Sequence, residues 1–379
     1  MRRSLFLPLL LVLSGLRGEA REWRVASAEE WAAVQPEPGD HIVWTPGRYG
    51  DVKMRLKAQG TEQAPIVLRA SQPEATIFSA ASQLEVRGAW IVVEGLVFEE
   101  TTIDPIVLRD ARHCRVTACV VRACNPPGVR LHYLRVGGRT SADNRIDHCR
   151  FEEKRTDGVM LVVDGDEGQL ALRTQIEHNL FRGVFKAVRN GMEAIRIGDS
   201  GFQRIDAQTL VADNRFEDCR GDAEVVSVKS SANVIRGNRF TGCEGAAIVL
   251  RHGDRNVVEG NRIDGASRER AGGIRLHGSG HLVRGNTIER TGTFAIALPA
   301  GNSVLKDTGH APVVDAVIER NRIVNPAGPV FLLGEPHDDQ KKQDTAPRGV
   351  IFRANVVEGA GAQPQVKEFL KVEGGVRWE

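Results

Sequence analysis

Three features are missing from this sequence of 379 residues, and each absence narrows what the protein can be. Charge of one sign is not in excess, since 51 Lys and Arg stand against 49 Asp and Glu and the net charge is +2. No basic tail is visible, so we expect no nucleic-acid partner, and attraction to an acidic substrate must come from a local cluster. The cysteines form no C-x-x-C pair, which argues against the common cysteine-based metal sites. The six are Cys114, Cys119, Cys124, Cys149, Cys219 and Cys243. We interpret them as buried small thiols, with disulfides as the alternative.

A long apolar run is absent from the body of the chain and occurs only at its beginning. Residues 1–20 combine two arginines, an apolar run and small residues at Gly18 and Ala20, which is the layout of a secretory signal peptide. The run is too short for a membrane anchor. We therefore predict a signal peptide over 1–20, a mature chain from Arg21 and a periplasmic or secreted location, with no membrane association beyond the signal peptide.

What the chain does have is a repeat. From Ile66 onward, short strand-like runs alternate with clusters of Gly, Asn, Asp and Ser. An Asn followed by two or more residues of a strand recurs at intervals of 35, 24, 23, 25, 35 and 34 residues. A step in the twenties, interrupted by three insertions and without a helical pattern, indicates a solenoid, and the Leu-dense signature of leucine-rich repeats is absent. The recurring residues are Asn179, Asn214, Asn238, Asn261, Asn286, Asn321 and Asn355.

This repeat predicts an all-β fold, a parallel β-helix in which each coil stacks on the coil before it at about 4.8 Å. We expect the recurring asparagines to form an inward ladder at one corner, bonded to the next coil, and not an active site. Residues 26–34 are predicted to form a short amphipathic helix, with Ser27 as N-cap, that closes the open end of the stack. No composition break divides 21–379, so we predict one domain, which we expect to be a monomer.

Three segments between the strands are expected to lie outside the stack. Insertions at 198–209 and 303–315 are predicted to form loops that flank one face and act as walls. Residues 334–348 are polar and are predicted to form a solvated excursion.

The stretch with the richest chemistry lies between Asn190 and Arg275. Asp222 and Glu224 are two residues apart, so both carboxylates should project from one face of a strand and attract a cation. With the amide of Asn190 they offer three oxygen ligands for a hard divalent metal, in a shell left open for water or substrate.

A lysine and two arginines near these carboxylates suggest β-elimination on a uronate polysaccharide. That reaction needs the sugar carboxylate neutralised, the C5 proton removed and the departing O4 stabilised. Lys229 is the candidate base if burial or neighbouring charge lowers its pKa. Arg251 would stabilise the departing oxygen, and Arg275, 24 residues later, is expected to stack beside it and bind carboxylates. Because Glu224 and Lys229 are an odd number of residues apart, the proposal requires a bend or bulge near 227–230.

Histidines and a further acid lie in the same stretch. His252 and His277 are candidate substrate contacts, with a structural corner role as the alternative. His277 and His281 have a zinc-like spacing, but across a turn, which weakens that interpretation. Glu193 and Arg196 are interpreted as a structural pair.

Several of these motifs together resemble polysaccharide lyase family 6, which contains chondroitinase B and many alginate lyases. The motifs are N-G-M-E-A-I-R-I-G from Asn190, E-V-V-S-V-K-S-S from Glu224, L-R-H-G from Leu250, G-G-I-R-L-H-G-S-G-H from Gly272 and N-R-I-D-H-C-R-F from Asn144.

The resemblance implies a right-handed β-helix, Ca²⁺ as cofactor and elimination that leaves an unsaturated uronate end. Carried over by position, Asn190, Asp222 and Glu224 resemble the calcium ligands, Lys229 the base and Arg251 the acid. Arg275 resembles a substrate-binding arginine, and His252 follows the catalytic arginine as it does in the family. At Asp222 the best-known members carry the longer Glu, so calcium affinity is expected to differ.

Alginate is the expected substrate, and dermatan sulfate, the substrate of chondroitin B lyase, is the alternative within the family. Outside it, a mannuronan C5-epimerase would remove the same proton without expelling O4. A non-catalytic carbohydrate-binding β-helix is a further alternative.

Overall fold

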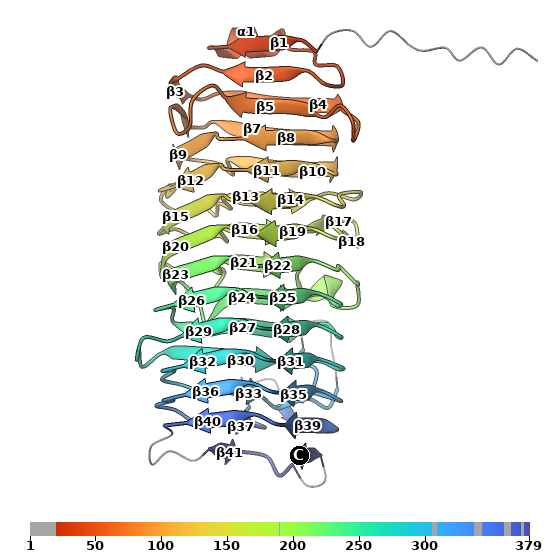
Figure 1. Ribbon diagram of the computed structural model, residues 1–379, viewed down its shortest axis with the longest axis vertical. Coiled ribbons are helices and arrows are strands. Elements are labelled where there is room, and N and C mark those ends of the chain that lie inside the picture. The colour runs from red at the N-terminus through yellow and green to blue at the C-terminus, as the bar shows by residue number, and fades with distance from the viewer. Residues whose placement is uncertain (1–19, 189, 305–308, 337–342, 360–364, 373–374) are drawn as a thin grey trace, which may run out of the picture.

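A computed structural model describes residues 20–188, 190–304, 309–336, 343–359, 365–372 and 375–379. The predicted signal peptide therefore lies, except for Ala20, outside the described residues. Figure 1 shows a column of stacked coils that runs from the N-terminal to the C-terminal end of the chain. Within the described residues, no helix has the length and hydropathy needed to cross a membrane.

Three parallel sheets, called A, B and C here, run along the column, and each coil contributes one strand to each sheet in turn. Sheet A contains β1 (Glu22–Val25), β2 (His41–Trp44), β5 (Ile66–Ala70), β8 (Ile91–Glu94), β11 (Arg115–Thr117), β14 (Arg145–Asp147), β19 (Gln175–Glu177), β22 (Leu210–Ala212), β25 (Val234–Arg236), β28 (Val257–Glu259), β31 (Leu282–Arg284), β35 (Val317–Glu319), β39 (Val350–Arg353) and β42 (Val376–Trp378).

Sheet B contains β3 (Gly47–Gly50), β6 (Thr76–Ala80), β9 (Val97–Thr101), β12 (Val120–Arg122), β15 (Arg150–Lys154), β20 (Leu180–Phe185), β23 (Arg215–Arg220), β26 (Arg239–Thr241), β29 (Arg262–Asp264), β32 (Thr287–Glu289), β36 (Arg322–Val324) and β40 (Val356–Glu358).

Sheet C contains β4 (Lys53–Gln59), β7 (Gln83–Ala89), β10 (Ile106–Arg112), β13 (Leu134–Gly137), β16 (Leu161–Val163), β21 (Ile195–Ile197), β24 (Glu224–Lys229), β27 (Gly245–His252), β30 (Ala271–Leu276), β33 (Ile296–Leu298), β37 (Phe331–Leu333) and β41 (Val366–Glu368). The predicted parallel β-helix is confirmed, and the chain has the right-handed form of its structural relatives.

The interior is built from side chains that repeat from coil to coil. Four phenylalanines of sheet B stack on consecutive coils with ring centroids 5.0, 5.0 and 4.5 Å apart. They are Phe151, Phe181, Phe216 and Phe240. These identical phenylalanine rings on successive coils add stacking contacts to the burial of apolar area. All six cysteines are also buried in the interior as free thiols, as predicted.

The predicted asparagine ladder lies at the corner where sheet A passes into sheet B. Asn238 is typical: its Oδ1 accepts from the backbone N and the Nδ2 of Asn214, both at 3.0 Å, and its own Nδ2 donates to Val211 O at 2.9 Å. The same pattern joins the asparagines from Asn179 to Asn355. The ladder satisfies the backbone groups that the turn leaves without a strand partner.

Two predicted segments differ from expectation. The helix α1 covers Ala28–Ala32, so it is shorter than 26–34; Ser27 accepts from Glu30 N at 3.1 Å, and Trp31 stacks on Trp44. That α1 closes the end of the stack stays a prediction. The excursion at 334–348 is not simply solvated, because β38 (Gln343–Thr345) pairs antiparallel with β34 (Gly301–Asn302) and buries Gln343. A second small hairpin joins β17 (Gly165–Asp166) to β18 (Gln169–Leu170).

Candidate functional site

Three adjacent strands of sheet C bring the predicted catalytic and binding residues together. Glu224 begins β24, Arg251 lies near the end of β27 and Arg275 lies in β30. Glu224 Oε1 accepts from Arg251 Nη1 at 2.5 Å and from Arg275 Nη2 at 3.0 Å. Only 3% of Glu224 is exposed. One buried carboxylate therefore holds both guanidinium groups in place.

A register shift lies beside Lys229, but its extra residue is not in the strand that carries Lys229. Val228 lies opposite Leu250, but the next residue, Lys229, lies opposite His252, so Arg251 is an extra residue in β27. A bulge of this kind re-aims the side chains beside it. The register thus shifts at the place expected, between Val228 and Lys229, but the extra residue is Arg251 of β27, so the shift does not by itself bring Glu224 and Lys229 onto one face.

Arg251 and Arg275 lie on adjacent strands and both reach Glu224, but the predicted 24-residue step that would place them directly opposite each other is wrong. Arg275 lies opposite Val249, two residues before Arg251, because the strands pair with an offset of 26 residues and not 24. The two arginines are joined by Glu224 Oε1, which accepts from both. Interval counting along the sequence missed this because the turns between the strands differ in length.

Lys229 lies in a mostly buried position beside a second buried acid. Its Nζ is 3.7 Å from Glu193 Oε1, and its side chain is 14% exposed. Burial lowers the pKa of Lys229, and the positive charges of Arg251 and Arg196 lower it further, against the opposing effect of Glu193 and Glu224. A lowered pKa increases the share of neutral amine, the form that accepts a proton.

Glu193 was expected to pair with Arg196, and this expectation is wrong because its ionic partner is Lys229. Burial raises the pKa of Glu193, and the negative charges of Asp222 and Glu224 act in the same direction, while Lys229 opposes them. Nothing in the sequence indicated that Glu193 contacts Lys229, because this contact depends on the packing of β24 against the segment before β21.

Glu224 is held as an anion. Burial alone would raise its pKa, but the charges of Arg251, Arg275 and Lys229 outweigh burial and lower the pKa to about 2. Burial also lowers the pKa of Arg275 from its usual value. The site therefore contains a fixed carboxylate between two cations, next to an amine that gives up its proton more readily than usual.

The remaining predicted metal ligands lie close to each other. Asp222 Oδ2 accepts from the backbone N of Gly191 at 2.7 Å and of Met192 at 3.1 Å, and its Oδ1 accepts from Ala223 N at 2.7 Å. Asn190 is exposed and directly precedes Gly191. These amides fix the Asp222 carboxylate at the turn that carries Asn190.

Two observations bear on whether a cation fits here. Glu224 Oε2 and Glu193 Oε2 are buried and make no hydrogen bond within the described part of the chain, and a hard cation is a suitable partner for such oxygens. No cluster of three or more His, Cys, Asp or Glu among the described residues has the arrangement of a metal site. Asn190, Asp222 and Glu224, with one amide and two carboxylates, thus remain a predicted ligand set.

A stack of three histidines stands beside the arginines. His310 lies between His252 and His277, with ring centroids 5.6 and 4.6 Å away. His252 Nε2 also contacts Ser200 Oγ at 3.1 Å, from the short helix η1 (Ser200–Phe202). Ser200 and His310 come from the two insertions expected to form walls. His310 itself was missed, because nothing in a loop sequence shows which side chain turns inward.

His281 has a structural role that fits the alternative to zinc. It accepts from Asn256 N through Nδ1 at 3.2 Å, and its Nε2 lies 2.8 Å from His277 O. Asn256 Oδ1 in turn accepts from Asn233 N, so His281 continues a second ladder at another corner.

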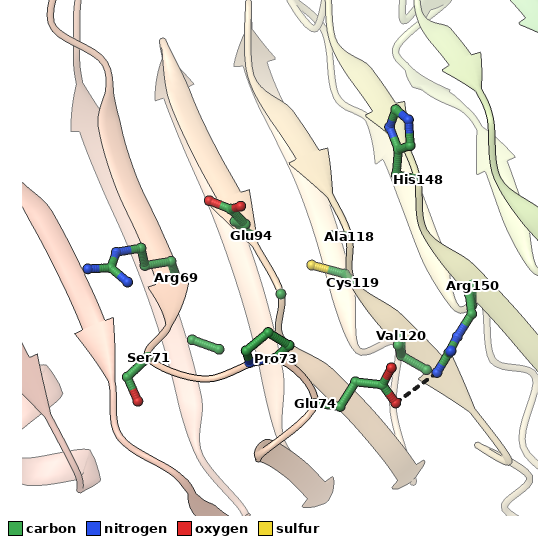
Figure 2. Close-up of a pocket in the computed structure, with 12 residues that line it drawn as sticks. Arg69, Ser71, Pro73, Glu74, Glu94, Ala118, Cys119, Val120, His148 and Arg150 are labelled. Atoms are coloured by element: carbon green, nitrogen blue, oxygen red, sulfur yellow. Dashed lines mark hydrogen bonds and ion pairs between the residues drawn. The ribbon is translucent and has the colours of Figure 1, made fainter.

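A cavity of about 440 Å³ lies away from this site, where sheet A passes into sheet B in the N-terminal part of the column. Figure 2 shows Arg150 bonded to Glu74 across it, with Arg69, Glu94 and His148 on its sides. None of the residues predicted for catalysis, substrate or metal lines it.

The protein is a parallel β-helix with a buried carboxylate, two arginines and a lysine of lowered pKa on one sheet. These are the features of an enzyme acting on acidic polysaccharides. The chain belongs to the chondroitinase B family, whose model matches residues 25–354. This membership places it among the polysaccharide lyases.

Solved structures agree. A mannuronic acid-specific family 6 polysaccharide lyase from human gut microbiota superposes with a TM-score of 0.83 at 28% identity, over 94% of this chain and 86% of that one. The family 6 alginate lyase AlyGC gives 0.85 at 28% identity, over 94% of this chain and 50% of that one. A family 6 alginate lyase in complex with a trisaccharide gives 0.79 at 22% identity, over 95% and 84%, and shows the shared fold. No curated protein matches the sequence.

Proposed function

We propose that the protein is an exported alginate lyase that cleaves its polymer by Ca²⁺-assisted β-elimination. The observation that carries the proposal is the cluster on sheet C, where Lys229 has a lowered pKa and Glu224 fixes Arg251 and Arg275 within 3.0 Å. Two solved lyases of the family, each 28% identical to this chain, are described as mannuronic acid-specific and as an alginate lyase. These descriptions support alginate as the polymer.

In the proposed reaction, Lys229 acts as the base. Its neutral amine takes the C5 proton of the uronate, the electron pair moves toward C4, and the C4–O4 bond breaks to leave a 4,5-unsaturated uronate. Arg251 stabilises the negative charge on the departing O4, since arginine itself gives up a proton with difficulty. Arg275 binds a uronate carboxylate, and His252 and His277 contact the sugar at the side of the cluster.

Asn190, Asp222 and Glu224 would hold the calcium ion, for which the buried Glu224 Oε2 is a suitable donor. When bound, the ion would neutralise the substrate carboxylate and so make the C5 proton more acidic. Arg251 and Arg275 already surround Glu224, so the chain itself supplies much of the positive charge that the uronate needs.

The test is ultraviolet absorbance of the unsaturated product when the mature protein is incubated with alginate or, separately, with dermatan sulfate. Each polymer is tested with calcium and with a chelator. We expect absorbance to rise on alginate with calcium and to fall when the chelator is present. A rise only on dermatan sulfate would reassign the substrate, and activity unaffected by the chelator would remove calcium from the proposal. No rise on either polymer would contradict lyase activity and direct attention to epimerisation, which leaves the polymer uncut.

A further inference from the structure

A furrow crosses the surface at the corner between sheets A and B, above the asparagine ladder. It is a cavity of about 470 Å³ whose floor follows one position of the turn on five consecutive coils. That position is held by Asp213, Gly237, Gly260, Gly285 and Arg320, which all have φ between 53° and 63°. Since Asp213 and Arg320 adopt this conformation, glycine is not required for the turn itself.

The three glycines leave the middle of the furrow open. A Cβ placed on Gly260 or Gly285 would meet no atom within 4 Å. Consecutive coils are about 4.8 Å apart, so the open floor extends over roughly 10 Å between its first and last glycine. An extended chain fits a shallow channel of this kind better than a compact small molecule does.

Arg236, Glu259 and Arg284 line the sheet A side of the furrow, and a row of arginines lies next to the furrow on sheet B, outside its lining. On the sheet A side, Arg236 lies beside Glu259 and Glu259 beside Arg284 in register. On the sheet B side, Arg215, Arg239 and Arg262 occupy one register position of β23, β26 and β29, and all three are exposed. Like charges side by side on neighbouring strands are destabilising unless acidic neighbours compensate them.

Several of these arginines form ion pairs with acidic side chains, and two do not. Arg284 pairs with Glu259 at 2.7 Å, Arg262 with Glu289 at 3.2 Å and Arg215 with Glu217. Within the described residues, Arg236 and Arg239 have no acidic side chain within salt-bridge distance. They stand on either side of Gly237 and are both exposed, so their guanidinium groups are available to an anion.

We propose that this furrow and the exposed Arg239 next to it form a second binding site for the acidic polysaccharide, in which Arg236 and Arg239 bind uronate carboxylates of an extended segment. The identity of the polymer rests on the proposed function; the basic character of the site does not. Guanidinium groups bind carboxylates through paired hydrogen bonds, and a polyuronate presents one carboxylate per sugar along its length.

The position of the furrow separates it from the catalytic cluster. Each coil has three corners, and the corner between sheets A and B is the one that sheet C does not border. A segment in the furrow therefore leaves the catalytic cluster on sheet C free. Retaining one part of a polymer raises the effective concentration of the rest at the catalytic site.

The test compares polymer retention by native electrophoresis through gels with increasing alginate, in a Lys229→Ala background with chelator so that the polymer stays intact. We expect Arg236→Ala/Arg239→Ala to weaken retention about fivefold, as for the loss of two exposed ion pairs. Gly260→Asp, which should fold because Asp213 holds the same turn position, is expected to weaken it as well by placing an anion in the furrow.

The matched control is Arg48→Ala/Arg182→Ala, which removes the same charge from exposed arginines of sheet B that are paired with acids. Equal loss of retention in this control, or no loss in the furrow variants, would overturn the proposal. Retention by double-stranded DNA that equals retention by alginate and is lost in the same variants would overturn the assignment to polysaccharide. Since electrophoresis needs no turnover, it reports on the furrow even if the lyase assay is negative. In the otherwise unaltered enzyme, the furrow variants should raise KM for polymer and leave cleavage of short oligouronates unchanged.

Discussion

Two regions of this β-helix bury polar side chains in opposite ways. At the corner between sheets A and B, each ladder asparagine gives and accepts hydrogen bonds with the next coil, as Asn238 does with Asn214 and Val211. On sheet C, buried charges crowd together, and Glu224 Oε2, Glu193 Oε2 and Arg275 Nε make no hydrogen bond in the described part of the chain. The hydrogen bonds of the ladder asparagines are complete, whereas on sheet C these buried polar atoms could still accept or donate a hydrogen bond.

This difference separates residues that hold the fold from residues that act on a substrate. A buried polar group with all its partners is neutral or favourable for stability, whereas one without them costs about 1–3 kcal/mol. A fold keeps such a cost where the groups serve another purpose, and perturbed pKa values at Lys229, Glu193 and Glu224 mark the same place. The ladder and the sheet C cluster should therefore respond differently to mutation.

The largest expected effect is on turnover. Lys229→Ala should lower kcat on alginate by about 10² or more, the usual cost of losing a general base, with little change in the folded structure. Lys57→Ala, an exposed lysine on the same sheet, is the control and should keep full activity. The measurement is the initial rate of ultraviolet absorbance. Activity above about a tenth of the original would remove Lys229 as the base.

The ladder should show the reverse response. Asn238→Ala leaves Asn214 N and Val211 O without their partner in the interior, so we expect a loss of about 2–4 kcal/mol in the free energy of unfolding. Turnover per folded molecule should be unchanged. Asn355→Ala, at the half-buried end of the ladder, should lose less. Denaturant unfolding measures both, and equal losses would mean that burial is not what makes the ladder matter.

Lys154 sharpens the comparison between satisfied and unsatisfied buried groups, because it is a fully buried, charged side chain that makes a hydrogen bond. Its Nζ donates to Leu131 O at 2.8 Å, and burial lowers its pKa to about 8 from 10.5. The folded state thus binds fewer protons than the unfolded state between pH 8 and 10.5, so stability should rise with pH across that window. Relative to Lys154→Met, which has no proton to lose, the gain should be about 2–3 kcal/mol. A constant difference between the two proteins would contradict the lowered pKa.

The smallest expected effect concerns the histidine stack beside the sheet C cluster. His310→Ala removes the ring that separates His252 from His277, so both should lose a fixed orientation. We expect KM for alginate to rise a few-fold, with kcat nearly unchanged, in steady-state kinetics. His178→Ala, which removes a corner histidine stacked on His148, is the control and should leave KM as it is. A loss in kcat as large as that of Lys229→Ala would make His310 part of the chemistry.

Much of the fold could be predicted because the sequence repeats at a nearly regular interval. The asparagine spacing predicted the coils, the inward ladder and the insertions, since one residue type at one corner repeats the same hydrogen bonds. The helix at Ala28–Ala32 was predicted from its N-cap, Ser27, although its length was not. Local patterns of this kind need no knowledge of distant contacts.

The residues of the site could be predicted from the sequence, but the contacts between them could not. Asp222, Glu224, Lys229 and Arg251 stood out by residue type and spacing, whereas the partnership of Glu193 with Lys229 did not. That contact depends on how β24 packs against its neighbour, and the relation of Arg251 to Arg275 depends on strand register. Both are set by turn lengths and a bulge, which the sequence does not show directly.

The most direct test of the division between the ladder and the sheet C cluster is thermal unfolding of Lys229→Met beside Asn238→Ala, both in chelator. Burial disfavours the charged form of Lys229 and raises the pKa of its partner Glu193, which can take up a proton once the lysine is gone. Lys229→Met should therefore leave Tm at or above that of the original protein, while Asn238→Ala should fall well below it. If Lys229→Met lost as much Tm as Asn238→Ala, the lysine would be holding the fold, and the account of sheet C as a site built for chemistry would be contradicted.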